Sequence, residues 1–144
     1  MTAVQVPPSG LEARGRNVLV VSVVDDDESV RRAVERLIRS FGFTVVVFAS
    51  AEEFLVSNHL YDTSCLILDV WMPRMNGLQL QAHLVRVGCR VPIIFITAHP
   101  DETLQAQAFQ AGAVDFLQKP FSNDALLKAI RRAFRFFAVD GLPG

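Results

Sequence analysis

Short runs of apolar residues alternate along the chain with longer segments of helical periodicity. The runs are rich in Val, Ile, Leu and Phe without polar alternation, as expected for strands that are covered on both faces. Strands are predicted at Val18–Val24, Thr44–Phe48, Cys65–Leu68, Ile93–Ile96 and Val114–Leu117. The second, TVVVF, is the expected edge strand. Strands that alternate with helices predict an α/β fold with a parallel sheet.

The segment after the first strand has the clearest amphipathic pattern. Its inward positions are Val30, Ala33, Val34, Leu37, Ile38 and Phe41, and its outward positions are Arg31, Arg32, Glu35, Arg36 and Arg39. Gly42 follows at the place of a left-handed C-cap. The next helix opens with Ser50 and Glu53 at capping-box spacing. Both helix boundaries therefore have a chemical cause.

Three further helices are expected at about 76–88, about 101–111 and from 122 or 123 onward. The second of these has only Leu104 and Phe109 as large apolar residues, so thin packing and mobility are predicted for it. The last helix is expected to place five residues inward, namely Leu126, Leu127, Ile130, Phe134 and Phe137.

Right-handed crossovers limit five alternating βα units to a few arrangements. We predict a single doubly wound five-stranded parallel sheet of order 2-1-3-4-5, the flavodoxin-like arrangement. Strands 1 and 3 are neighbours in that order, and the helices that follow them cover opposite faces. A crevice then opens beyond the carboxyl ends of these two strands, where open α/β sheets bind their ligands.

The composition is that of one folded domain: 144 residues, 51% hydrophobic and 20% charged, with a net charge of -1. This balance gives no electrostatic footprint for direct nucleic-acid binding. The two cysteines, Cys65 and Cys89, lack the spacing of a zinc site or a disulfide scaffold.

The longest apolar stretch, Val18–Val24, is far shorter than a membrane span. Residues 1–16 do not have the pattern of a secretory signal. We therefore expect a soluble, cytoplasmic protein without a membrane partner. It is divided into a flexible leader at 1–16, a domain at 17–138, and a tail or the start of a linker at 139–144.

Chemically competent side chains follow four of the predicted strands. Asp25 and Asp26 come after the first strand, Asp69 after the third, Thr97 after the fourth and Lys119 after the fifth. Two carboxylates about 4 Å apart repel by about 4 kcal/mol at an effective dielectric constant near 20, so three carboxylates call for a cation. Oxygen donors that share a metal with phosphate favour Mg²⁺, with Mn²⁺ as a substitute.

A phosphoryl group at this edge could be carried covalently by Asp69, because a carboxylate is the nucleophile of aspartyl-phosphate chemistry. Lys119 would neutralise the phosphoryl oxygens, and the Thr97 hydroxyl would donate a hydrogen bond to one of them. Phosphoryl transfer asks mainly for positioning and charge stabilisation, so no further general base is required.

Four separated segments, VVDDDESVRR, LILDVWMPRMNG, IIFITAH and AGAVDFLQKPF, closely resemble the receiver domains of bacterial two-component response regulators. The resemblance covers about residues 17–138. The segment FASAEEFL and the LQKPF ending are most similar to the nitrogen-fixation-regulator subgroup, whose full-length members carry a C-terminal helix-turn-helix for transcription regulation.

The resemblance implies a role for each matching residue. Asp69 becomes the phosphoacceptor, Asp25 and Asp26 the acidic pair at the metal, and Trp71 a metal ligand through its backbone carbonyl. Thr97 becomes the switch hydroxyl and Lys119 the phosphate-binding ammonium. Two further implications are an aromatic switch at Phe116 and a cis bond between Lys119 and Pro120.

The family also implies partners. A histidine kinase would donate the phosphoryl group. Phosphorylation would shift the packing of the fourth helix, fifth strand and fifth helix, and it would favour a homodimer through that surface. The chain would then be either a single-domain regulator or a receiver separated from an effector, and the sequence leaves both open.

Several residues near these motifs fit other roles. Asp27 fits a helix cap better than a metal ligand, and His59, His83 and His99 fit surface positions, with His99 near enough to the site to modulate dephosphorylation. The strand end LILD also resembles nucleotide-hydrolysing enzymes, but a GxxxxGK loop is absent from the sequence.

Two rival functions belong to other classes. A hydrolase with an aspartyl-phosphate intermediate, of the haloacid-dehalogenase type, needs D-x-D, whereas Trp71 occupies the third position of DVWMP. An unphosphorylated scaffold with the same fold is disfavoured because every chemical position is filled.

Overall fold

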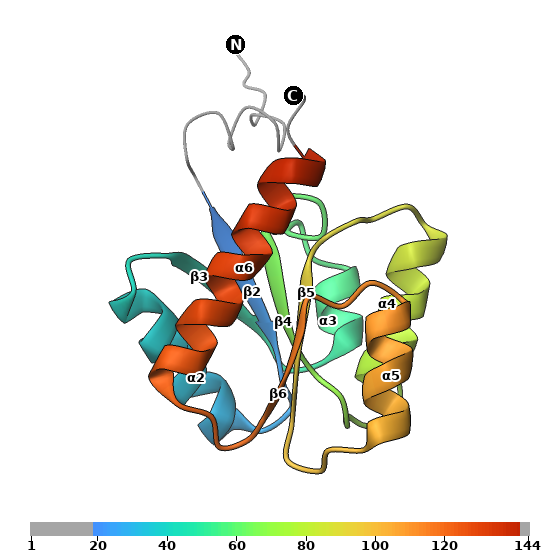
Figure 1. The fold of residues 1–144 in the computed structure, drawn as a ribbon, viewed down its shortest axis with the longest axis horizontal. Coiled ribbons are helices and arrows are strands. Elements are labelled where there is room, and N and C mark those ends of the chain that lie inside the picture. Colours follow the sequence, from blue (N-terminus) through green and yellow to red (C-terminus); the bar gives the residue numbers. More distant parts are fainter. Residues whose placement is uncertain (1–18, 142–144) are drawn as a thin grey trace.

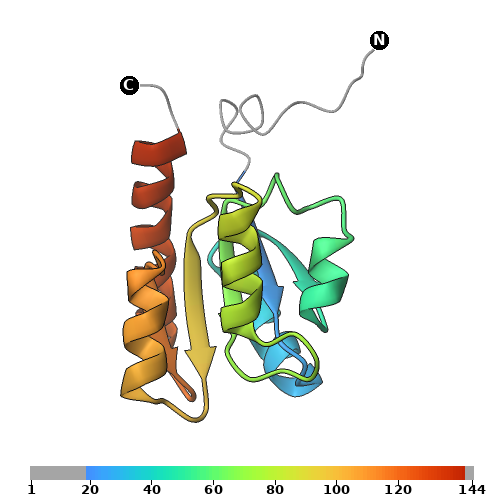
Figure 2. The ribbon, with the colours of Figure 1, turned by 90° about the vertical axis from the view of Figure 1, so that its right-hand side faces the viewer.

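The computed structural model describes residues 19–141, with side chains to Arg135. The leader predicted at 1–16, residues 142–144 and the inward side chain predicted for Phe137 lie outside the described part. A five-stranded parallel sheet forms the centre, with helices on both faces (Figure 1; Figure 2). Among residues 19–141, every helix is too short or too polar to cross a lipid bilayer.

The strands are β2 (Val20–Val24), β3 (Thr44–Phe48), β4 (Cys65–Asp69), β5 (Ile93–Thr97) and β6 (Asp115–Gln118). The helices are α2 (Glu28–Ser40), α3 (Ala51–Leu55), α4 (Gly77–Arg86), α5 (Glu102–Gln110) and α6 (Asn123–Gly141). The spatial order is β3-β2-β4-β5-β6, which is 2-1-3-4-5 in chain order. The predicted fold class and the edge position of Thr44–Phe48 are confirmed.

Small differences in the boundaries have local causes. The last strand lies one residue later than predicted, because Asp115 rather than Val114 pairs with Ile94. The helix α4 ends at Arg86 instead of Gly88, since Val87 already forms its C-cap and Gly88 turns away with φ +77°. The helix α6 continues through Gly141.

Helix caps fix the first two helices. The Asp27 carboxylate accepts the N–H groups of Ser29 and Val30, so the predicted cap role of Asp27 is confirmed. Gly42 has the left-handed φ of +93° that was predicted for it. At α3 the Ser50 hydroxyl accepts from Glu53, but the Glu53 carboxylate accepts from the preceding residue, Ala49, rather than from Ser50.

Two hydrophobic clusters lie on the two faces of the sheet. One joins the sheet to α3, α4 and α5, and the other joins it to α2 and α6. Not every predicted inward position belongs to them: Ala33 is exposed, because it lies at the margin of the α2 stripe that Val34 and Ile38 bury. The fully buried strands contribute residues to both clusters. Their close packing makes the sheet a rigid support for the side chains at its carboxyl edge.

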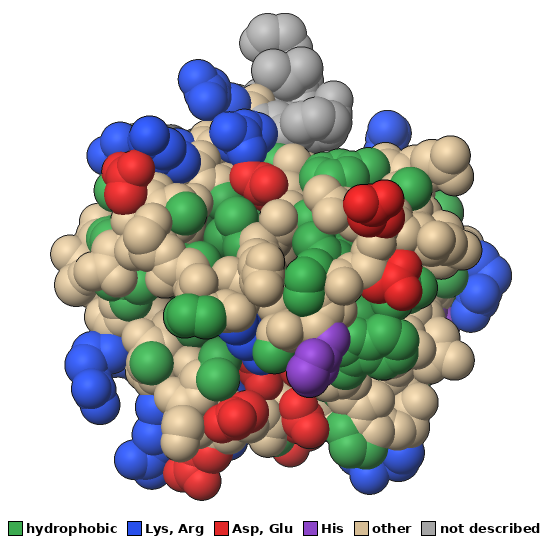
Figure 3. Space-filling view, turned by 60° about the horizontal axis from the view of Figure 1, so that its bottom comes forward, with side chains coloured by type: hydrophobic (Ala, Val, Ile, Leu, Met, Phe, Trp, Pro, Cys, Tyr) green, Lys and Arg blue, Asp and Glu red, His purple; other side chains and the backbone are tan. Residues whose placement is uncertain are grey.

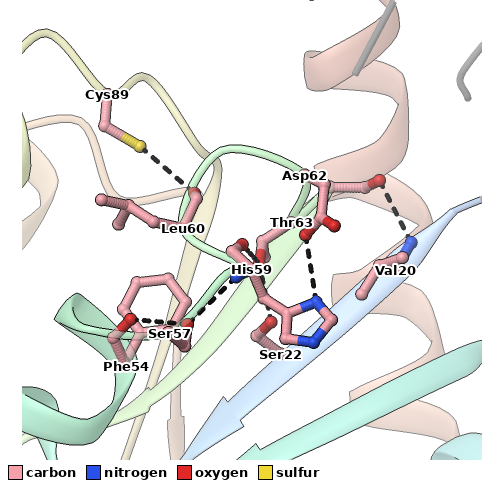
Figure 4. A network of polar contacts seen from close by, with 10 residues as sticks. Val20, Ser22, Phe54, Ser57, His59, Leu60, Asp62, Thr63 and Cys89 are labelled. Carbon is pink, nitrogen blue, oxygen red and sulfur yellow. Dashed lines mark hydrogen bonds and ion pairs between the residues drawn. The ribbon is translucent and has the colours of Figure 1, made fainter. Parts of the chain in front are cut away.

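The connection between α3 and β4 is tied down by polar contacts at the opposite edge of the sheet (Figure 4). The hydroxyls of Ser22 and Thr63 lie 2.7 Å apart, and Thr63 also donates to the His59 carbonyl. The His59 ring lies 3.3 Å from an Asp62 carboxylate oxygen. The histidine is thus part of a surface turn, as predicted.

The helix α5 is thinly packed, in line with the sequence. Only Ala108 is fully buried on it, and Leu104 is half-buried. Phe109 is 42% exposed, so it does not supply the packing that its size suggested. A buried side chain of α4, Gln81, donates to the Ala108 carbonyl at 3.0 Å and joins the two helices.

Candidate functional site

Parallel register brings the predicted chemical residues to one edge of the sheet. Val24 pairs with Leu68, so Asp25 and Asp69 leave β2 and β4 at the same level. Asp69 pairs with Ile96, which places Thr97 one residue further along β5. Thr97 pairs with Gln118, immediately before Lys119. The acidic side chains at this end of the molecule are visible in Figure 3.

Three carboxylates meet at this edge. Asp25, Asp26 and Asp69 each offer a carboxylate oxygen, and these oxygens lie within 4.8 Å of one another. Asp25 is fully buried, Asp69 is 5% exposed, and Asp26 is exposed to solvent. Oxygen-only donors with one open side fit a hard divalent cation that keeps part of its water shell.

Lys119 supplies the positive charge opposite these carboxylates. Its ammonium donates to Asp25 Oδ2 at 2.8 Å and lies 3.5 Å from Asp69 Oδ1. The Lys119 backbone N–H donates to the Thr97 carbonyl at 2.7 Å, which fixes the start of the connection after β6. The Lys119–Pro120 bond is cis, as the resemblance implied.

The turn after β2 is held by contacts that the sequence pattern did not predict. The Arg31 guanidinium donates to the Asp25 carbonyl at 2.8 Å, although helical periodicity placed Arg31 on the outer face of α2. A long side chain can fold back from that face toward the helix N-terminus. In addition, the Asp27 N–H donates to Asp25 Oδ1 at 2.9 Å. Both the backbone carbonyl and the side chain of Asp25 therefore accept hydrogen bonds that hold the turn.

Gly77 allows α4 to begin close to Asp69 at the end of β4. A Cβ atom at Gly77 would lie 2.4 Å from the Asp69 carbonyl oxygen and 3.1 Å from Phe95. Its N–H donates to the Val70 carbonyl at 2.9 Å. Sequence reasoning used Gly77 only as a helix start. Its second role depends on a tertiary contact, which the local sequence does not report.

The surroundings shift the pKa values of the two central groups. Burial raises the pKa of the Asp69 carboxyl to about 7, and repulsion from Asp25 adds to the effect, while Lys119 opposes it. For Lys119, burial lowers the pKa, but the hydrogen bond and charge of Asp25, together with Asp69, outweigh it and raise the pKa above its ordinary value. A divalent cation would favour the ionised form of Asp69.

The hydroxyl of Thr97 is oriented by the chain that follows it. Thr97 is fully buried, and its Oγ1 accepts the backbone N–H of His99 at 3.0 Å. His99 itself is exposed beside the site. Phe116 is half-buried on β6, and its ring centroid lies 6.0 Å from that of Phe95 on β5. The ring therefore rests on the strand that carries Thr97.

Trp71 lies in the connection between β4 and α4, two residues after Asp69, and it is 47% exposed. The same connection contains Arg74, whose φ of +64° is unusual for a residue with a side chain. Glu52 of α3 contacts this connection through the Met75 N–H. Sequence reasoning missed Glu52, since nothing in the local pattern marks a contact across 23 residues.

Comparisons with known proteins agree with this geometry. The model of the response regulator receiver domain family matches residues 21–131. Nodulation protein W of Bradyrhizobium diazoefficiens is 49% identical over 111 residues, which cover 77% of this chain and 49% of that protein. Response regulator protein TodT of Pseudomonas putida is 43% identical over 127 residues, or 88% of this chain and 56% of that protein.

The chain thus spans about half the length of the curated relatives it matches. A crystal structure of FixJ-N superposes with a TM-score of 0.74 at 37% identity, covering 81% of this chain and 94% of that one. The fold, the sequence identities and the resemblance to nitrogen-fixation regulators all indicate the same family. The chain belongs to the response regulator receiver domain family of two-component systems, and its homologues include FixJ-type and TodT-type regulators.

Proposed function

We propose that this domain accepts a phosphoryl group from a histidine kinase on Asp69, in a reaction that depends on Mg²⁺ and for which Mn²⁺ can substitute. The observation that carries the proposal is the gathering of three carboxylates within 4.8 Å, with the Lys119 ammonium 3.5 Å from Asp69. A nucleophilic carboxylate, a cation site and a fixed ammonium are the parts that phosphoryl transfer to an aspartate needs.

The side chains of Asp25, Asp26 and Asp69, with the backbone carbonyl of Trp71, would hold the cation. Bound there, the cation neutralises negative charge on the phosphoryl oxygens. Arg31 and Asp27 keep the Asp25 turn in place through the contacts described above. These contacts hold the Asp25 carboxylate in place for the cation before the donor arrives, which lowers the entropic cost of the transfer.

In the transfer itself, an Asp69 carboxylate oxygen forms a bond to phosphorus while the phosphorus–nitrogen bond of the donor phosphohistidine breaks. The imidazole keeps the electron pair of that bond. Lys119 then pairs with the phosphoryl oxygens, and the Thr97 hydroxyl donates a hydrogen bond to one of them. Attack by water on the same phosphorus returns Asp69 to its free form, so the domain assists both its phosphorylation and its dephosphorylation.

The output of the switch would be a changed surface over α5, β6 and α6. Thr97 moves toward the phosphoryl group, and Phe116, whose ring lies against Phe95 on the strand that carries Thr97, turns inward. The thin packing of α5 makes that helix the element that responds at the lowest cost. The new surface favours a symmetric homodimer, or engages an output domain or partner that controls transcription in the cytoplasm.

The test uses a small acyl phosphate as donor. We expect wild-type protein with Mg²⁺ to gain one phosphoryl group, detected by intact-mass spectrometry and lost in base, and we expect EDTA to prevent this gain. Asp69→Asn removes the nucleophile, whereas Asp62→Asn changes an exposed aspartate in the turn after α3 and serves as the matched control. Equal labelling of Asp69→Asn and wild type would refute the proposal.

Two further measurements separate the alternatives. Steady release of alcohol from a generic phosphate ester would indicate a hydrolase rather than a switch. Light scattering with and without the donor measures the dimer, which should form only in the phosphorylated sample.

A further inference from the structure

Outside the acidic site, a contact joins α3 to the connection between β4 and α4. Oε2 of Glu52 accepts the backbone N–H of Met75 at 3.2 Å and lies 3.8 Å from the Arg74 side chain. Its other oxygen, Oε1, is buried and has no hydrogen-bond partner among the described residues. The Glu52 side chain as a whole is 41% exposed, so the bond to the Met75 N–H fixes the backbone of this connection rather than compensating for deep burial of the carboxylate.

The connection from Val70 to Asn76 packs Met72 and Met75 against the core but has few other hydrogen bonds in its middle. At its start, the Val70 N–H donates to the Ile96 carbonyl, and the Gly77 N–H donates back to Val70. At its end, Asn76 caps α4. Between these points the backbone passes through Arg74 at φ +64°, a conformation that side chains disfavour.

Glu52 contacts the connection immediately after this disfavoured residue. We propose that Glu52 is a positioning residue, which holds the connection after Asp69 in the path that presents the Trp71 carbonyl and the Asp69 carboxylate to the cation. This inference rests on the proposed function, because it assumes that Mg²⁺ binds at that site. Glu52 does not touch the cation or the phosphoryl group. It acts through the backbone N–H of Met75 and the side chain of Arg74.

Two conservative variants separate the effect of the negative charge of Glu52 from the effect of its side-chain length. Glu52→Asp keeps the negative charge but is one methylene shorter, so it no longer reaches the Met75 N–H. Glu52→Gln loses the charge but keeps an oxygen at the same distance, and it can still accept that hydrogen bond. If Glu52 acted on the cation only through its charge, the Gln variant would be the weaker binder and the Asp variant would resemble wild type.

A positioning role predicts the reverse order. We expect Glu52→Asp to raise the dissociation constant for Mg²⁺ by about three- to tenfold, the effect of one lost hydrogen bond. We expect Glu52→Gln to stay within about twofold of wild type. Glu53→Asp is the matched control, because it shortens the adjacent glutamate, whose carboxylate accepts from Ala49 instead of the connection.

Trp71 is the only tryptophan of the chain and lies in the same connection, so its fluorescence reports the titration with Mg²⁺. Hydrogen exchange at the Met75 amide, followed by NMR, gives a second readout, which should accelerate in Glu52→Asp and stay slow in Glu52→Gln. Thermal unfolding in EDTA checks that the variants are folded.

The outcomes are distinct. Wild-type protein that binds no Mg²⁺ overturns the proposed function and this inference with it. Normal wild-type binding, with Glu52→Asp as tight as Glu53→Asp, overturns the inference alone. A Glu52→Gln variant as weak as Glu52→Asp would also overturn it, because an acceptor oxygen kept at the same distance would then not be enough to hold the connection.

Discussion

The ammonium of Lys119 lies 2.8 Å from a carboxylate oxygen of Asp25, a residue 94 positions earlier in the chain. Asp25 is fully buried and the Lys119 side chain is 16% exposed, so the pair is largely removed from water. Lys119 therefore balances the acidic cluster before any phosphoryl group is present. The same ammonium is the group that phosphoryl oxygens would engage after transfer.

Removal of this ammonium should destabilise the metal-free protein. Because Lys119→Met leaves a buried carboxylate without its partner, we expect the free energy of unfolding at pH 8 to fall by about 2 to 4 kcal/mol, as measured with urea. Millimolar Mg²⁺ should reduce the loss. Lys128→Met removes an exposed lysine that pairs with Asp124 at 3.1 Å, and it should cost less than about 1 kcal/mol. Equal losses in the two variants would contradict the prediction.

The raised pKa of Asp69 predicts a pH dependence of stability. Its folded pKa of about 7 lies above the ordinary value of 3.8, so the folded state binds more protons than the unfolded state between these values. The free energy of unfolding should then fall as pH rises from about 4 to 7, by up to about 4 kcal/mol from this group.

Urea unfolding at pH 5, 6, 7 and 8 in EDTA measures this slope. Asp69→Asn cannot ionise and should flatten the profile, and Mg²⁺ should flatten that of wild type, since it stabilises the ionised carboxylate. The prediction is wrong if Asp69→Asn keeps the wild-type slope.

The close approach of Gly77 to the backbone of β4 allows an effect on stability to be distinguished from an effect on the geometry of the site. In Gly77→Ala the new Cβ meets the Asp69 backbone, which must shift, so we expect a loss of about 1 to 3 kcal/mol in stability together with weaker Mg²⁺ binding. Gly42→Ala places a side chain at φ +93° with nothing within 4 Å. It should cost about 1 to 2 kcal/mol but leave Mg²⁺ affinity unchanged. Unfolding and titration by Trp71 fluorescence check both variants.

The features that could be predicted from the sequence are the strands, the strand ends and the helix caps, because local patterns determine them. Apolar runs identify the strands, and parallel pairing carries the strand ends to one edge, so the meeting of Asp25, Asp69 and Lys119 follows from position in the chain. Caps at Asp27 and Gly42 follow from residue types that suit those backbone conformations.

The contacts that escaped prediction are tertiary. Helical periodicity gives the direction of Cβ, so it placed Arg31 outside, while four further bonds of the side chain allowed the guanidinium to reach the Asp25 carbonyl. The bond from Met75 to Glu52 joins two elements whose relative placement no local pattern reports. Such contacts become evident only when the packed arrangement of the sheet and the helices is known.

The exposed indole of Trp71 predicts an effect on the lifetime of the phosphorylated state. A bulky side chain two residues past the acceptor crowds the path of the attacking water, so Trp71→Asn should speed dephosphorylation by about three- to tenfold, equivalent to roughly 1 kcal/mol in the barrier. Loss of phosphoprotein over time, followed by mass spectrometry after removal of the donor, measures the rate. Tyr61→Asn changes an exposed aromatic residue remote from the carboxyl edge and should leave the rate unaltered. Identical lifetimes for wild type and Trp71→Asn would show that the indole does not crowd the path of the attacking water.

The buried amide of Gln81 predicts how firmly α5 is held. Gln81 is 3% exposed, and its amide donates to the carbonyl of Ala108, the one residue of α5 that is fully buried. Gln81→Leu keeps the bulk but removes one of the two donors to that carbonyl, which still accepts the Ala113 N–H, so the local cost is that of one hydrogen bond, about 0.5 to 1.5 kcal/mol. Because α5 has little other packing, this cost should appear as faster amide exchange along Glu102–Gln110, by about tenfold, while β4 and β5 stay protected. Gln107→Leu, on the exposed face of the same helix, should not change the exchange. If α5 exchanges as slowly in Gln81→Leu as in Gln107→Leu, other contacts hold the helix and its thin packing does not make it the responsive element.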